Sequence, residues 1–175
     1  VWTPAVPADF RLKRHFESRG IQALKRAELL GVITRDRPTL AVAGTHGKTT
    51  TSSWLADMIM AHPAGCHAFL GGIDAATGTN LLTRPGAAWH VVEADEFDRS
   101  FHQLHPTHAA VTNLDPDHLD VYGTEEAFRE AFHTFGSQVT QTLIVPHDLP
   151  WPSQKNLERF AVVDLGEDVP DGVDH

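Results

Sequence analysis

Short apolar runs alternate with glycine, proline and acidic residues along most of the sequence, and this alternation is the strongest constraint on the fold. Two stretches with helical spacing, residues 49–61 and 124–135, lie among the runs, and Leu55, Met58 and Ile59 are predicted to form the apolar face of the first. Strands that alternate with helices form βαβ units, so we expect an α/β fold with a mostly parallel sheet flanked by helices. The runs predicted to be strands are residues 40–43, 67–70, 89–92, 109–111, 142–145 and 160–163.

Residues 1–38 differ from the rest and are predicted to form a small separate α/β unit. They contain two short helix-like stretches, residues 8–19 and 26–32, and they end in the polar connector 34–38. We place a domain boundary at this connector, with residues 39–175 as the larger domain. The sequence starts at Val1 and stops at His175 without a helix cap, so we expect it to be a piece of a longer protein.

The composition excludes several classes of function. Hydrophobic residues make up 41% of the 175 residues, enough for a buried core, and no run approaches the 18 apolar residues of a membrane helix. The net charge of -9 argues against a nucleic-acid-binding surface. The single cysteine, Cys66, excludes an internal disulfide framework. We therefore expect a cytoplasmic protein with no membrane or nucleic-acid partner.

Polar, reactive side chains follow three of the predicted strands. In a parallel sheet, ligands bind at the carboxyl ends of the strands, so these segments are the candidates for chemistry. The segments are GTHGKTT at residues 44–50, EADE at residues 93–96 and TNLDPDH at residues 112–118. A lysine loop, an acidic cluster and an Asp/His cluster are thus predicted to meet at one edge of the sheet.

The first segment has the end of a phosphate-binding loop but not its beginning. Gly47, Lys48 and Thr49 fit the pattern G-x-x-x-x-G-K-[ST], whereas Val42 stands where the first glycine is expected and Gly44 is the nearest alternative. A glycine-rich turn before a helix lets backbone N–H groups bind phosphate, Lys48 would neutralise phosphate charge, and Thr49 would ligate Mg²⁺. The segment is either a chance match, a broken loop or a shorter loop.

Glu93 and His118 complete a candidate metal site. Glu93 stands where a carboxylate is needed to hold Mg²⁺, directly or through water. Mg²⁺ prefers oxygen ligands, so His118 would bind a second metal, Mn²⁺ or a metal-bound water. Taken singly, the acidic cluster could be a solvated loop and His118 a surface histidine, and it is their combination that favours a metal site.

The three segments, extended to GTHGKTTT, VVEADEFDRSF and VTNLDPDHLDVYG, resemble the Mur ligases. The resemblance runs from about Val1 to Phe135, and a loop with glycines at positions 44 and 47 is this family's own form of the phosphate loop. It implies that residues 39–175 are a truncated central ATP-binding domain. Residues 1–38 would be the carboxy-terminal part of a UDP-sugar-binding domain.

The resemblance also implies an activity, and the third segment favours the alanine-adding branch of the family. Such an enzyme uses ATP and Mg²⁺, with two metal sites and Mn²⁺ as a possible substitute. It joins L-alanine to the carboxylate of UDP-N-acetylmuramate through an acyl phosphate, in peptidoglycan precursor synthesis. The isolated 175-residue piece would be inactive, because residues for adenine and the amino acid are expected beyond it.

Carried over to this sequence, the family's functional residues fall into four groups. Lys48, Glu93 and His118 would be catalytic. Thr49, Glu93 and His118 would hold metal, and Thr79 and Asn80 would face the UDP-sugar. No lysine stands in the helix after His118, so the carbamylated-lysine ligand of some members is not expected. The nucleotide would be held by Gly44, Thr45, His46, Gly47, Lys48, Thr49 and Thr50.

Three other functions remain open from the sequence. The first is a recycling ligase that attaches a whole peptide to UDP-N-acetylmuramate, and the second is a non-catalytic nucleotide-binding module. The third is a small-molecule kinase or simple NTPase, which shares the phosphate loop but does not account for the second and third segments. The oligomeric state is left open.

Overall fold

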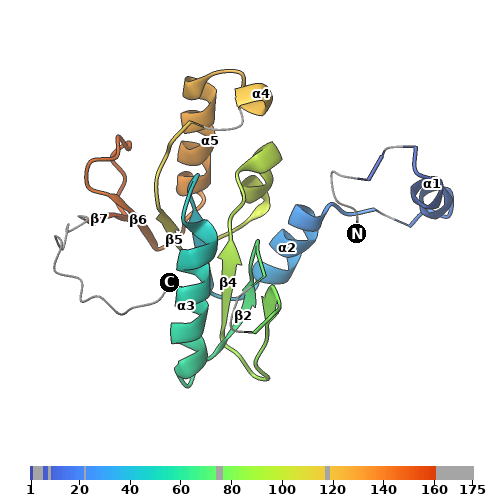
Figure 1. The fold of residues 1–175 in the computed structure, drawn as a ribbon, viewed down its shortest axis with the longest axis horizontal. Helices are drawn as coiled ribbons and strands as arrows, with labels where there is room; N and C mark the ends of the chain where they lie inside the picture. The colour runs from blue at the N-terminus through green and yellow to red at the C-terminus, as the bar shows by residue number, and fades with distance from the viewer. Residues whose placement is uncertain (2–5, 8, 22, 74–76, 117–118, 161–175) are drawn as a thin grey trace.

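The computed structural model describes residues 1, 6–7, 9–21, 23–73, 77–116 and 119–160, and its centre is a seven-stranded sheet (Figure 1). The strands lie in the order β3-β2-β4-β1-β5-β6-β7, and every neighbouring pair is parallel except β2 and β3. The predicted mostly parallel α/β fold is therefore confirmed. The strands are β1 (Thr39–Ala43), β2 (Cys66–Phe69), β3 (Leu81–Leu82), β4 (Trp89–Glu93), β5 (His108–Val111), β6 (Thr142–Pro146) and β7 (Leu157–Phe160).

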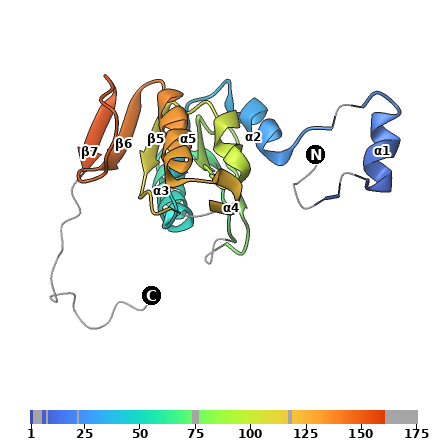
Figure 2. The same cartoon turned by 90° about the horizontal axis from the view of Figure 1, so that it is seen from above.

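Helices cover both faces of the sheet, while the first helix lies away from it (Figures 1 and 2). Helix α3 packs on β1, β2 and β4, and helix α5 lies on the other side together with the 3-10 helix η1. None of the helices within the described residues is long and apolar enough to cross a membrane. The helices are α1 (Arg11–Glu17), α2 (Arg26–Thr34), α3 (Lys48–Ala61), η1 (Phe97–Gln103), α4 (Leu119–Tyr122) and α5 (Glu125–Ser137).

The central strands are apolar on both faces, as expected for a parallel sheet covered by helices. Successive side chains of a strand point to opposite faces, so neighbouring residues enter different clusters. Ala41 and Val92 belong to the larger cluster under α5 and η1, whereas Val91 and Leu40 belong to the smaller cluster under α3. The central strands are therefore held from both faces of the sheet.

An aromatic group joins α5 to η1. Phe128, Phe132 and Phe135 are fully buried on one face of α5, as their helical spacing predicts. The ring of Phe101 in η1 stacks on Phe135 with centroids 5.0 Å apart, and it meets Phe132 edge to face at 5.0 Å. α5 itself begins where predicted, because Thr124 Oγ1 accepts a hydrogen bond from the Ala127 N–H group.

Several sequence predictions need correction or stay open. β7 begins at Leu157 rather than at residue 160, and residues 161–163 of that predicted strand lie outside the described residues. The edge strand β3 and helix η1 were not predicted. Met58, assigned to the apolar face of its helix, is 69% exposed. Met58 instead lines an open apolar groove together with Trp54 of the same helix and residues of β1, β5 and β6.

Helix α2, assigned to the amino-terminal unit, packs against η1 of the larger unit. The approach is close, because a Cβ atom added at Gly31 would collide with the backbone carbonyl oxygen of Gln103. Thr34, at the end of α2, is fully buried, and its backbone oxygen accepts a hydrogen bond from Thr39 Oγ1 at 3.0 Å. The domain boundary at residues 34–38 stays a prediction. Helix α2 precedes this boundary in the sequence, but it packs against η1, which follows it.

The aromatic group predicts a large difference between two phenylalanines of the same helix. Replacing the fully buried Phe101 with alanine should lower the free energy of unfolding by about 3–5 kcal/mol, because it leaves a cavity against α5. The control is Phe97→Ala, since Phe97 is 40% exposed, and its cost should be less than half as large. Denaturant unfolding followed by circular dichroism measures both. Equal costs would contradict this description of the core.

Candidate phosphate-binding and metal site

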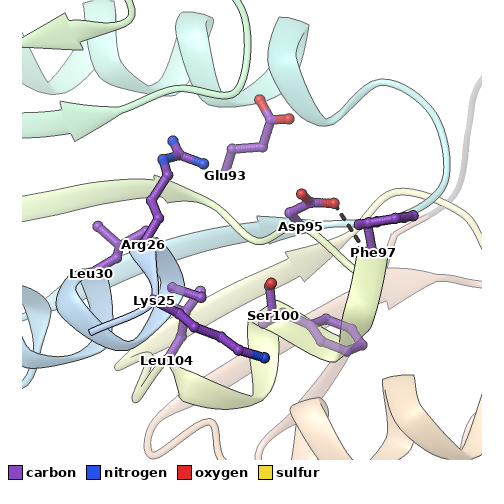
Figure 3. A pocket seen from close by; sticks show the side chains of 10 residues that line it. Lys25, Arg26, Leu30, Glu93, Asp95, Phe97, Ser100 and Leu104 are labelled. Atoms are coloured by element: carbon purple, nitrogen blue, oxygen red, sulfur yellow. Dashed lines mark hydrogen bonds between the residues drawn. The ribbon is translucent and has the colours of Figure 1, made fainter. Parts of the chain in front are cut away.

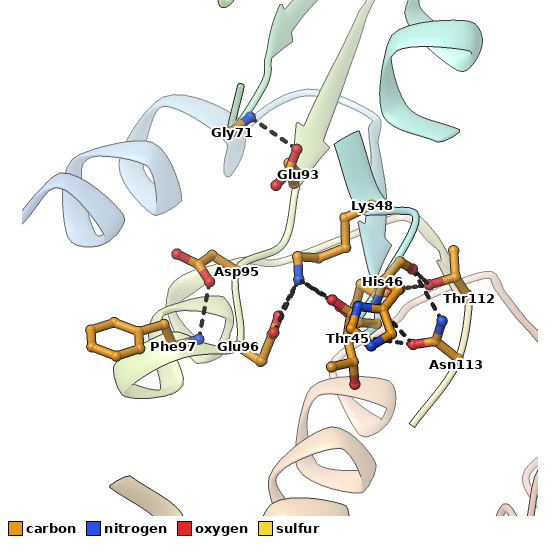
Figure 4. Close-up of polar contacts among 12 residues, drawn as sticks. Thr45, His46, Lys48, Gly71, Glu93, Asp95, Glu96, Phe97, Thr112 and Asn113 are labelled. Atoms are coloured by element: carbon orange, nitrogen blue, oxygen red, sulfur yellow. Dashed lines mark hydrogen bonds and ion pairs between the residues drawn. The ribbon is translucent and has the colours of Figure 1, made fainter. Parts of the chain in front are cut away.

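The three polar segments meet at one edge of the sheet because β1 lies between β4 and β5. Val42 of β1 is in register with Glu93 of β4, and Ala43 of β1 is in register with Val111 of β5. All three strands are parallel, so their carboxyl ends point the same way. The lysine loop, the acidic cluster and the segment after β5 therefore surround one place (Figure 4).

The lysine loop is a short turn that leads directly into α3. Gly47 is the N-cap of α3 and adopts a left-handed conformation with φ 78°, which favours glycine. Gly44, with φ 134°, lies so close to β5 that a Cβ atom would collide with Thr112 Oγ1. The first N–H groups of a helix lack partners within it, and the helix dipole adds positive potential, so the start of α3 suits a phosphate.

Asn113, just beyond β5, holds the shape of this loop. Its Oδ1 accepts hydrogen bonds from the Thr45 and His46 N–H groups, at 2.8 and 3.0 Å. Its Nδ2 donates to the His46 carbonyl at 3.2 Å, and Thr112 Oγ1 donates to the same carbonyl at 2.6 Å. The backbone N–H groups of Thr45 and His46 are thus already engaged. The N–H groups that remain for an anion lie at Gly47 and in the first turn of α3.

The side chain of Lys48 bends back onto its own loop and onto Glu96. Its Nζ atom lies 2.8 Å from Glu96 Oε2 and 3.0 Å from Oε1. It also donates to the carbonyls of Gly44 and Thr45, at 2.7 and 3.3 Å. The side chain of Glu96 is only 2% exposed. Burial raises the pKa of the Glu96 carboxyl above its ordinary value, and the hydrogen bond from Lys48 opposes that rise.

Glu93 and Thr49 each lie close to one of two successive glycines that follow β2. Glu93 Oε2 accepts a hydrogen bond from the Gly71 N–H group at 3.0 Å, and a Cβ atom at Gly71 would collide with the Glu93 carboxylate. A Cβ atom at Gly72 would lie 3.2 Å from Thr49 Cγ2. The glycine pair therefore contacts both side chains, and Glu93 and Thr49 flank the same short segment.

The oxygens of Glu93 and Thr49 are of the chemical type that Mg²⁺ prefers. Mg²⁺ is held by one or two protein oxygens and keeps several waters or phosphate oxygens, so a carboxylate and a hydroxyl at the start of α3 are a suitable donor set. Within the described part of the chain there is no group of three or more His, Cys, Asp or Glu side chains that could hold a metal. The predicted ligand His118 lies outside the described residues.

The remaining predicted residues lie near the site but have other contacts in this structure. Thr50 is exposed in the first turn of α3. Thr79 Oγ1 accepts a hydrogen bond from the Leu81 N–H group, and the Asn80 carbonyl accepts one from Leu70, so both residues lie where β2 ends and β3 begins. Their predicted role toward a sugar stays a prediction.

A pocket opens beside Glu93, between α2 and η1 (Figure 3). Its volume is about 310 Å³. Arg26 extends from the start of α2 toward Glu93, and Lys25 reaches along the opposite side toward η1. Arg26 is thus the cationic side chain directed toward the candidate metal ligand, whereas the Lys25 Nζ atom pairs with Asp98 at 3.5 Å. It is lined by Lys25, Arg26, Ala27, Leu30, Glu93, Asp95, Phe97, Ser100, Phe101 and Leu104.

Sequence reasoning missed two residues of this site. Glu96 was noted only as part of the acidic cluster, and nothing in the spacing distinguishes the carboxylate that pairs with Lys48 from that of Glu93, which accepts a hydrogen bond from Gly71. Asn113 was read as part of the segment after β5 without a role. The sequence signal for Asn113 was its position directly after a predicted parallel strand. In the structure this strand, β5, pairs with β1, which places Asn113 against the lysine loop.

The sequence matches the family described as the Mur ligase middle domain over residues 42–169. Two relatives bear the name UDP-N-acetylmuramate–L-alanine ligase. The protein of Parabacteroides distasonis is 51% identical over 139 residues, which cover 79% of this chain and 30% of that protein. The protein of Flavobacterium johnsoniae is 49% identical over 152 residues, covering 86% and 34%. The chain thus spans about a third of the length of these relatives.

Solved structures agree with this match. The UDP-N-acetylmuramate-alanine ligase of Thermotoga maritima superposes with a TM-score of 0.74 at 25% identity, over 83% of this chain and 34% of that one. A UDP-N-acetylmuramate:L-alanyl-gamma-D-glutamyl-meso-diaminopimelate ligase from Neisseria meningitides gives 0.73 at 22% identity, over 89% and 56%, and shows the shared fold. The family model covers well over half of the sequence, and the chain belongs to the Mur ligase family.

Proposed function

We propose that this chain is the ATP-binding part of a ligase that joins L-alanine to the carboxylate of UDP-N-acetylmuramate, a step of peptidoglycan precursor synthesis in the cytoplasm. The observation that carries the proposal is the placement of Lys48 and Glu93 after two neighbouring parallel strands, with Thr49 and Glu93 both close to the Gly71-Gly72 pair. A non-catalytic nucleotide-binding module would need the loop alone. The names of relatives about half identical to this chain support the choice of substrates.

The proposed chemistry has two steps. A carboxylate oxygen of the acceptor attacks the γ-phosphorus of ATP, the bond from that phosphorus to the bridging oxygen breaks, and ADP leaves. The amino group of L-alanine then attacks the acyl carbon, the bond to the phosphate oxygen breaks, and an amide, phosphate and a proton are released. Both steps need anions held close together in a defined orientation, which is what a preorganised site supplies.

Within this scheme each residue of the site has a physical task. The start of α3 and Lys48 would hold the β- and γ-phosphates. Thr49 and Glu93 would hold Mg²⁺, which supplies charge that offsets the repulsion between phosphate and carboxylate. The cationic side chain of Arg26, directed toward Glu93, makes the pocket beside Glu93 a suitable approach for the anionic acceptor. Thr79 and Asn80 are proposed to face the sugar, and His118 to hold a second metal.

The proposal is tested with the full-length protein, UDP-N-acetylmuramate, L-alanine and Mg-ATP, with the product followed by mass spectrometry. Lys48→Ala should lower turnover about 100- to 1,000-fold, as expected for losing one preorganised contact to the transferring group. Lys155→Ala is the control, since Lys155 is exposed in the connection between β6 and β7. Product formed only with a peptide in place of L-alanine would favour the recycling ligase instead. Unchanged turnover in Lys48→Ala would refute the site.

A second prediction concerns the metal. Glu93→Gln keeps the shape of the side chain but removes its charge, so the Mg²⁺ concentration for half-maximal activity should rise about ten- to hundredfold. Glu158→Gln, on the exposed edge strand β7, is the matched control and should leave the Mg²⁺ dependence unchanged. A Glu93→Gln protein with the parental Mg²⁺ dependence would show that the metal is held elsewhere.

A further inference from the structure

The ammonium group of Lys48 has all of its hydrogen-bonding capacity engaged within the protein (Figure 4). A lysine has three donors, and Nζ has three partners here: the carbonyls of Gly44 and Thr45 and the carboxylate of Glu96. A phosphate that binds Lys48 must therefore displace at least one of them. Of the three, only Glu96 carries a charge, so it is the strongest competitor for the ammonium group.

Glu96 is held firmly in its position. The Tyr122 hydroxyl donates to the Glu96 backbone carbonyl, and the Arg99 N–H group donates to the same carbonyl at 2.9 Å. The guanidinium group of Arg99 lies over the Tyr122 ring, 5.0 Å from its centroid. Both partners of the ion pair are shielded from water, with exposed fractions of 13% for Lys48 and 2% for Glu96. Salt and solvent therefore screen this pair weakly.

We propose that Glu96 is the counter-ion from which an incoming phosphate must take Lys48, so that this carboxylate lowers the nucleotide affinity of the loop. The proposal rests on the proposed nucleotide site and adds a positioning residue to it. A phosphate and a carboxylate are both anions, and they compete for one ammonium group. When the phosphate wins, the Glu96 carboxylate stays buried beside it and repels it.

The test measures the binding of Mg-ADP to the full-length protein by isothermal titration calorimetry. Glu96→Gln removes the charge but keeps an oxygen and the size of the side chain, and the dissociation constant should fall about tenfold, the lower end of what a hydrogen bond to a charged group contributes. Loss of structure would weaken binding, so tighter binding reports the counter-ion role. Glu96→Asp, whose carboxylate is one methylene shorter, should also bind more tightly, by a smaller factor.

Two controls separate the ion pair from general charge effects. Asp98→Asn removes the same charge two residues away, at a left-handed position that asparagine tolerates, and its side chain contacts Lys25 rather than Lys48. It should change the dissociation constant less than twofold. In a Lys48→Ala background, Glu96→Gln should tighten binding no more than Asp98→Asn does.

The outcomes are distinct for the two proposals. Unchanged or weaker Mg-ADP binding in both Glu96 variants, or an equal gain in Asp98→Asn, would overturn the counter-ion role. If the parental protein binds no Mg-ADP, or binds it equally well after Lys48→Ala, the proposed nucleotide site itself fails. Tighter binding confined to the Glu96 variants, and lost with Lys48, is the result expected.

Discussion

The site depends on the position of β1 between β4 and β5 in a parallel sheet. Parallel pairing puts the carboxyl ends of all three strands at one edge of the sheet. Both faces of these central strands are buried, as is usual for parallel strands. Segments that are distant in sequence, after Ala43, Glu93 and Val111, are thereby brought to one place. Ligands of open α/β sheets bind at such an edge, and the chemistry of this chain is concentrated there.

The shortness of the phosphate loop is compensated by its neighbour. This loop is shaped by hydrogen bonds with Asn113 and Thr112 after β5. The close contact of Gly44 with Thr112 leaves no space for a side chain there. The shape of the loop therefore depends on the residues after β5, and through them on the sheet.

The sequence was sufficient for those parts of the fold that follow from local pattern. Apolar periodicity predicted β1, β4, β5, β6 and the burial of α5, and the segments after three strands predicted the edge that carries the site. It could not distinguish Glu96 from Glu93, because pairing with Lys48 depends on how η1 turns after β4. The left-handed residues Asp98 and Arg99 in that turn have no glycine signal to announce them. Met58 was misassigned because helical spacing alone does not show which parts of an apolar helix face are covered: Met58 lines an open groove over β1, β5 and β6.

The most direct test of the account is a crystal structure of the full-length protein with Mg²⁺ and a non-hydrolysable ATP analogue. The account predicts the γ-phosphate at the start of α3, with Lys48 Nζ about 3 Å from a phosphate oxygen. It also predicts a magnesium ion about 2.1 Å from Thr49 Oγ1, with Glu93 bound to it directly or through one water. A nucleotide bound away from the Gly44–Thr49 loop, or a metal held without Thr49 and Glu93, would contradict it.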